Sequence, residues 1–224
     1  MPRLLSTLLI AALLSACASK PDEAPERTEA EQYREARESM ESNNYVTAVD
    51  RLKAVQIGHP LGDGTQMGPV VSEVQHKRVL GYLEKGTAAG AETVLEGGAT
   101  QVEGCAGGHY VKPALLAGSL DNVAAREEIF GPVLSVIGFT SFDDAMQIAN
   151  DTIYGLAAAV WTSDLSKAHR AARTLRAGSV WVNQYDGGDM TAPFGGFKQS
   201  GNGRDKSLHA FDKYTELKAT WIKL

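Results

Sequence analysis

A carboxylate and an aromatic side chain stand two residues apart, just before an apolar stretch of the chain. They are Glu128 and Phe130, and the apolar stretch that follows, Val133–Phe139, is expected to form a strand. In α/β folds a ligand cleft commonly opens beside the end of a strand. We therefore treat the pair as candidate ligand contacts. The alternative is a surface carboxylate next to a core phenylalanine.

A second candidate is an aromatic turn near the C-terminal end. Phe194 lies between a proline and two glycines, and glycine permits the tight backbone that directs a neighbouring ring outward. Asp186 and Asp189 precede this turn, and their charge would attract a cationic substrate. The alternatives are a core phenylalanine and solvated loop acids.

The two cysteines and five histidines do not form a metal site. There is no CxxC pair and no histidine spacing typical of zinc ligands. Cys105 lies in a glycine-rich loop and is interpreted as an ordinary loop cysteine. We therefore predict no metal ligand and no catalytic residue in this chain.

The composition excludes some functions and divides the chain. Lys and Arg total 22 against 27 Asp and Glu, a net charge of −5, so no basic surplus favours nucleic acid. All 23 glycines lie from Gly58 onward, whereas average usage would place about four in the first 56 residues. The chain therefore has two parts of different character.

The first 17 residues resemble the signal peptide of a bacterial lipoprotein. The apolar run Leu4–Leu14 is shorter than the roughly 20 residues of a membrane-spanning helix and has the length of a signal-peptide core. The string Leu14–Cys17 is similar to a lipobox, which makes Cys17 the expected lipidation site. Lipidation would anchor the chain to the outer membrane, facing the periplasm. The alternative is a plain signal peptide.

Residues 18–56 predict a tether and a helical hairpin. Residues 18–28 are polar and contain two prolines, and residues 29–56 read as two helices joined by an Asn43–Asn44 turn, similar to one tetratricopeptide unit. Leader, tether and hairpin together resemble the N-terminus of outer-membrane assembly lipoproteins of the BamD/ComL type.

From residue 57 onward, helices and strands are expected to alternate. Such alternation predicts an α/β fold with a mostly parallel sheet. Asn183 is expected to tie loop backbone, and residues 214–224 to form a terminal extended arm. The expected helices span 72–86, 141–150 and 165–175, and the expected strands 93–95, 110–116, 133–139, 157–162 and 179–183.

Several strings in this part carry a family resemblance. Residues 57–224 are similar to the C-terminal third of an NAD(P)-dependent aldehyde dehydrogenase, part of its catalytic domain. The strings "DGGDMT" and "NGRDKSLHAFDKYTELK" resemble the aminoaldehyde subgroup, such as γ-glutamyl-aminobutyraldehyde dehydrogenases. The strings that carry the family resemblance are "GDGTQMGPVVS", "REEIFGPVLSV", "ANDTIYGLAAAVWTSDLSKAHR", "AGSVWVN" and "PFGGFKQSGNGR".

The resemblance implies roles for single residues. It implies NAD or NADP as cofactor, with Glu128 accepting hydrogen bonds from the nicotinamide ribose and Phe130 packing beside the nicotinamide. Phe194 would line the aldehyde tunnel, and Asp189 would contact an aminoaldehyde. The C-terminal strand would mediate homo-oligomer formation.

The resemblance also implies what residues 57–224 do not contain. The family's nucleophilic cysteine, its general-base glutamate and its nucleotide-binding half precede the matching strings. We therefore expect a truncated dehydrogenase that is inactive alone and holds the cofactor poorly. The alternatives are a lipid-anchored assembly or scaffold lipoprotein, or an artefactual fusion of two genes near Val55–Gly58. A cytoplasmic location is the alternative for the dehydrogenase part.

Overall fold

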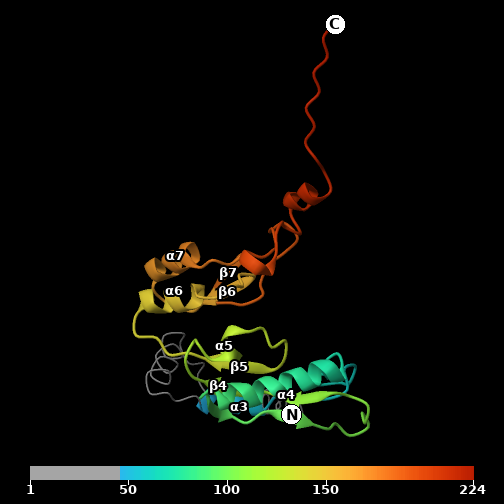
Figure 1. Ribbon diagram of the computed structural model, residues 1–224, viewed down its shortest axis with the longest axis vertical. Coiled ribbons are helices and arrows are strands. Elements are labelled where there is room, and N and C mark those ends of the chain that lie inside the picture. Colours follow the sequence, from blue (N-terminus) through green and yellow to red (C-terminus); the bar gives the residue numbers. More distant parts are fainter. Residues whose placement is uncertain (1–45) are drawn as a thin grey trace, which may run out of the picture. The chain divides into compact units, whose positions relative to one another are not determined.

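The computed structural model describes residues 46–224 (Figure 1). The predicted leader with Cys17, the tether and the first helix of the predicted hairpin lie outside the described residues. The second helix of that hairpin is present as α3, Val46–Lys53. Within residues 46–224, no helix combines the length and apolar character needed to span a membrane.

Helix α4, Glu73–Ala88, is the longest described helix, and its ends follow from local chemistry. The Ser72 hydroxyl accepts a hydrogen bond from the Gln75 amide at 3.2 Å, which caps the N-terminus. Gly86 lies in the last turn, where an added Cβ would come within 3.0 Å of the Ala124 side chain. The sequence predicts this helix correctly, apart from two more residues at its end.

A three-stranded sheet packs beside α4 in the order β1, β4, β5. β1 is Glu92–Leu95, β4 is Ala114–Ala117 and β5 is Val133–Val136. β1 runs antiparallel to β4, whereas β4 and β5 are parallel, with Leu115 opposite Leu134. All four residues of β4 are buried, so this strand is the centre of the sheet.

The expectation of a mostly parallel sheet is wrong for this region. The strand expected over 110–116 is divided at Pro113, which has no backbone N–H to donate to a ladder. Its first part, β3 (Tyr110–Lys112), forms an antiparallel hairpin with β2 (Gly98–Thr100). Two strands that are joined by a short connection run antiparallel. The sheets of the described residues therefore contain both parallel and antiparallel pairs.

Asn122 joins helix α4 to the short helix α5, Val123–Arg126. Its side-chain amide donates to the Gly86 carbonyl at 2.9 Å, and its side-chain oxygen accepts from the Ala124 amide at 2.9 Å. The Asn122 side chain is buried, so these partners replace water. One residue thus satisfies the end of α4 and the start of α5.

The remaining helices and strands alternate along the chain. α6 is Phe142–Asn150 and α7 is Leu165–Thr174, and the strands β6, Ala157–Val160, and β7, Ser179–Val182, pair in parallel. Ser141 caps α6 by accepting from the Asp144 amide at 3.1 Å, as the sequence predicts.

Asn183 ties two loops together, as the sequence also predicts. It lies directly after β7 with φ +56°. Its side-chain oxygen accepts from the Thr162 amide at 2.8 Å, and its side-chain nitrogen donates to the Thr162 carbonyl at 3.1 Å. This reciprocal pair fixes the carboxyl ends of β6 and β7 relative to each other.

The turn after Phe194 clamps the loop between α6 and β6. The Lys198 ammonium donates to the carbonyls of Asn150 and Thr152 at 2.8 and 2.9 Å. The Ser200 hydroxyl accepts from the Gly155 amide at 3.0 Å. This clamp anchors one end of the loop that carries the aromatic turn.

The chain ends in a 3₁₀ turn, η2 (Leu208–Lys213), and a segment without regular secondary structure. The expected extended arm therefore has no strand partner within residues 46–224. Its large apolar side chains are exposed: Leu217, Trp221, Ile222 and Leu224.

We predict that Asn122→Ala lowers the free energy of unfolding by about 2 kcal/mol, because it removes two buried hydrogen bonds and leaves the Ala124 N–H without its partner. Urea denaturation monitored by circular dichroism measures this change. Asn202→Ala, at an exposed loop asparagine, is the control and should change stability by less than about 0.5 kcal/mol. Equal effects of the two substitutions would contradict the bridging role.

Candidate functional site

Glu128 and Phe130 lie in the connection between α5 and β5, and both are exposed. The Phe130 ring is 76% exposed, and its backbone has φ +59°, in the left-handed region that is uncommon for a residue with a large side chain. Ile129 between them is 6% exposed and belongs to the core. The alternative of a core phenylalanine at position 130 is therefore wrong.

Helix α4 holds the backbone of this connection. The Gln75 side-chain amide donates to the carbonyls of Ile129 and Phe130, both at 2.8 Å. The Arg78 guanidinium donates to the Glu128 carbonyl at 2.8 Å. Three successive carbonyls therefore point toward one face of α4.

The two neighbouring glutamates have different environments. The Tyr82 hydroxyl donates to the Glu127 carboxylate. This hydrogen bond, followed by burial, raises the pKa of Tyr82 above its usual range. Glu128 uses only its backbone carbonyl in contacts with α4. Within residues 46–224, the carboxylate of Glu127 is thus bound by α4, whereas that of Glu128 is not.

Arg126 fixes the start of the connection. Its guanidinium donates to the carboxylates of Asp151, at 2.9 Å, and Asp121, at 3.1 Å. A further bond reaches the Asp151 carbonyl at 2.7 Å, at the end of α6. The hydrogen bond from Arg126 lowers the pKa of Asp151 below its usual range. These bonds couple α5 to α6.

The aromatic turn is also fixed through its backbone. Phe194 and Asp205 exchange two backbone hydrogen bonds, at 2.8 and 2.6 Å. The Phe194 ring is 36% exposed, and the Lys206 ammonium lies 5.5 Å from its centroid. The ring is therefore on the surface of the described residues and not in their core.

Asp189 organises its own loop. One carboxylate oxygen accepts from the Thr191 hydroxyl and from the Thr191 amide at 2.7 Å. These bonds, the hydroxyl first, lower the pKa of Asp189, so the group is a carboxylate at neutral pH. Asp186 is exposed and has φ +59°. Within residues 46–224, no hydrogen bond or ion pair joins this loop to the Glu128–Phe130 connection.

Sequence reasoning missed the residues that position the candidates. Gln75, Arg78 and Tyr82 stand on α4 at positions that share one face, but their partners lie about 50 residues further along the chain. Trp181 and Tyr185 were missed as well. Their ring centroids lie 5.2 Å apart, and the Trp181 indole donates to a loop carbonyl. The sequence did offer one indication of Trp181, because it is the single aromatic residue in the string "AGSVWVN".

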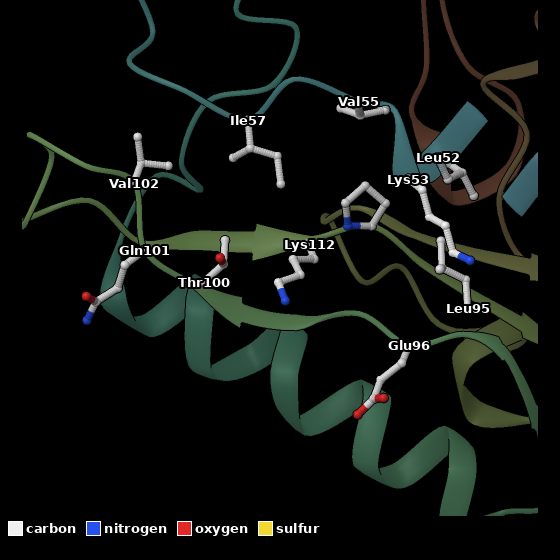
Figure 2. A pocket seen from close by; sticks show the side chains of 11 residues that line it. Leu52, Lys53, Val55, Ile57, Leu95, Glu96, Thr100, Gln101, Val102 and Lys112 are labelled. Carbon is white, nitrogen blue, oxygen red and sulfur yellow. The ribbon is translucent and has the colours of Figure 1, made fainter. Parts of the chain in front are cut away.

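A cavity of about 340 Å³ lies elsewhere, between the chain after α3 and the β2–β3 hairpin (Figure 2). Apolar side chains line it together with Lys53, Glu96 and Lys112. It contains none of the predicted site residues. Residues 46–224 also hold no group of three or more potential metal-ligating side chains.

The comparison with protein families gives the decisive observation. The family model described as the aldehyde dehydrogenase family matches residues 36–220. The chain belongs to the aldehyde dehydrogenase family. The match begins within the region for which a tetratricopeptide-like hairpin is expected, and it lends no support to the likeness with BamD/ComL-type lipoproteins.

Individual relatives agree with this assignment. The NADP/NAD-dependent aldehyde dehydrogenase PuuC of Escherichia coli is 51% identical over 170 residues, which are 75% of this chain and 33% of that protein. An indole-3-acetaldehyde dehydrogenase complexed with NAD⁺ has a TM-score of 0.76 at 58% identity, covering 83% of this chain and 37% of that one.

A third similar protein is the γ-glutamyl-γ-aminobutyraldehyde dehydrogenase of Burkholderia cenocepacia. Its TM-score is 0.74 at 54% identity, covering 81% of this chain and 36% of that one. The chain thus spans about a third of the length of the curated relatives it matches. NAD(P) is the coenzyme of the intact family. An exposed carboxylate for sugar hydroxyls and an exposed ring for a pyridine fit such a group.

We predict that the Arg126–Asp151 pair makes stability sensitive to acid. Because the folded-state pKa of Asp151 is lowered, its contribution is present above the unfolded pKa and is lost as the pH falls below about 4. Asp151→Asn should therefore cost stability at pH 6 and cost less at pH 3, measured by urea denaturation. A cost that is equal at both pH values would count against the ion pair. Asp63→Asn, at an exposed loop carboxylate, is the control.

Proposed function

We propose that residues 57–224 form the part of an NAD(P)-dependent aldehyde dehydrogenase that contacts the nicotinamide end of the coenzyme and the aldehyde. The reaction is the oxidation of an aldehyde to the acid, with aminoaldehydes as the substrate class. The observation that carries the proposal is the exposed Glu128 carboxylate beside the exposed Phe130 ring, on a backbone held by α4.

Each residue of the pair has a chemical role in this proposal. The Glu128 carboxylate accepts hydrogen bonds from ribose hydroxyls, and charged acceptors make the stronger bonds of this kind. The Phe130 ring packs beside the pyridine ring and limits its orientation. When bound, NAD(P) supplies the acceptor for the hydride that leaves the substrate. The chain's own contribution is therefore orientation.

The substrate side is assigned to the loop before the aromatic turn. Phe194 provides an apolar wall for the aldehyde, and Asp189 provides negative charge for a cationic amine. The lowered pKa of Asp189 supports this role because the carboxylate stays ionised. The likeness to a γ-glutamyl-γ-aminobutyraldehyde dehydrogenase supports an aldehyde whose chain carries a nitrogen function.

Turnover needs groups that residues 57–224 do not supply. The family's reaction uses a cysteine thiolate, a general-base glutamate and a nucleotide-binding half. We propose that this region is inactive unless they are provided. We also propose that the apolar arm at 214–224 mediates homo-oligomer formation, since its side chains are exposed.

The leader and the domain boundaries stay predictions. Lipidation at Cys17 would place the chain at the outer membrane, whereas the dehydrogenase part fits a cytoplasmic coenzyme supply. Either a real fusion or an artefactual joining of two genes near residue 57 would account for a leader of this kind.

The test of coenzyme contact is saturation-transfer NMR on the full chain with NAD⁺. We expect transfer to the nicotinamide ribose protons, and we expect Glu128→Gln to weaken binding about tenfold because a charge-assisted hydrogen bond is lost. Glu84→Gln, on the exposed side of α4, is the matched control. Absence of any transfer in the unchanged chain would refute the proposed role.

The substrate class has a separate test. Asp189→Asn should weaken binding of betaine aldehyde, whose trimethylammonium group is cationic, by up to about fivefold, because surface ion pairs contribute up to about 1 kcal/mol. Binding of butyraldehyde, which is neutral, should not change. Titrations followed by NMR line shifts measure both. Equal weakening of the two aldehydes would assign Asp189 a loop-stabilising role only.

A further inference from the structure

We propose that Gln75 is a positioning residue that sets the backbone of the Glu128–Phe130 connection, with Arg78 and Tyr82 as its partners on α4. The statement that the Glu128 and Phe130 side chains contact the coenzyme rests on the proposed function. The positioning itself rests on contacts within this chain and is tested separately.

The three side chains lie on one face of α4. Positions 75, 78 and 82 are spaced by three and four residues, which places them one above the other on a helix. Each contacts a different part of the connection: Gln75 contacts the carbonyls of Ile129 and Phe130, Arg78 that of Glu128, and Tyr82 the Glu127 carboxylate. This face of α4 therefore contacts four consecutive residues of the connection, 127–130.

The paired bonds of Gln75 explain the unusual backbone at Phe130. Successive carbonyls of an extended chain point in opposite directions. One amide nitrogen donates to two successive carbonyls here, both at 2.8 Å, which requires the backbone to turn between them. The φ of +59° at Phe130 is that turn. Gln75 thus stabilises a conformation that a phenylalanine rarely adopts.

The neighbours of Phe130 leave its ring only one direction. Ile129 is buried in the core, and a Cβ at Gly131 would lie 2.5 Å from Cγ2 of Val79, so both flanking residues face α4. The ring between them is directed outward and is 76% exposed. The contacts with α4 therefore leave the Phe130 ring and the Glu128 carboxylate exposed, while the Tyr82 hydroxyl donates to the carboxylate of Glu127.

The decisive variant is Gln75→Glu, which keeps the shape of the side chain but removes its N–H donors at pH 8. We expect the Phe130 Cα and Cβ chemical shifts, read in chain labelled with ¹³C-phenylalanine, to move toward extended values. Cleavage after Glu128 by a glutamate-specific protease should accelerate about tenfold, because loss of two hydrogen bonds favours local opening.

A change of pH separates positioning from packing. At pH 3.5, below the ordinary glutamate pKa of about 4.3, most of the carboxyl of the Gln75→Glu chain is protonated and regains one donor, so the Phe130 shifts should return partly toward those of the unchanged chain at the same pH. Glu84→Gln is the control and should leave the shifts unchanged at both pH values and the cleavage rate unchanged at pH 8. Arg78→Gln is a second variant and should accelerate the same cleavage if Gln75→Glu does not fold.

The outcomes are distinct. Unchanged Phe130 shifts and an unchanged cleavage rate in Gln75→Glu would overturn the positioning role. Shifts that move but show no recovery at low pH would overturn it too, since they would indicate a packing effect. If the unchanged chain shows no transfer to NAD⁺, the proposed coenzyme role fails, while the shifts and the cleavage still decide the role of Gln75.

Discussion

The buried face of α4, which carries Val79, Tyr82 and Gly86, is the constraint on which the β1–β4–β5 sheet and its connections depend. Val79 is fully buried and packs where Gly131 leaves space, and Gly86 packs closely on Ala124. The same helix therefore supports the core and the connection that carries Glu128 and Phe130. A helix with a different inner face would displace both, because close-packed interiors transmit such changes.

Local chemistry made much of this fold predictable. Ser141 caps its helix as expected, and Asn183 ties the loop that its position suggested, because both act on backbone within a few residues or at the end of one strand. The mixed sheet was not predictable from apolar runs alone. Pro113 divides one such run, and periodicity does not report which strand a chain returns to.

In the candidate site, too, one group of residues could be predicted from the sequence and another could not. Glu128 and Phe130 are candidates from a motif, and both are exposed on the described part of the chain. Gln75 and Arg78 were not identified, because their partners are 50 to 55 residues away and backbone carbonyls leave no trace in the sequence. Side chains that serve a site through backbone contacts are visible only in three dimensions.

The connection between Phe130 and β5 also has a fixed length, because both of its ends are attached. At one end the carbonyls of Ile129 and Phe130 are bound to α4, and at the other Val133 is paired with Ala114. One inserted residue would either break the first attachment or shift β5 in register, which sends every β5 side chain to the opposite face. A change of length in this segment would therefore disturb either the contacts with α4 or the pairing of β5, and a side chain at Gly131 would meet Val79.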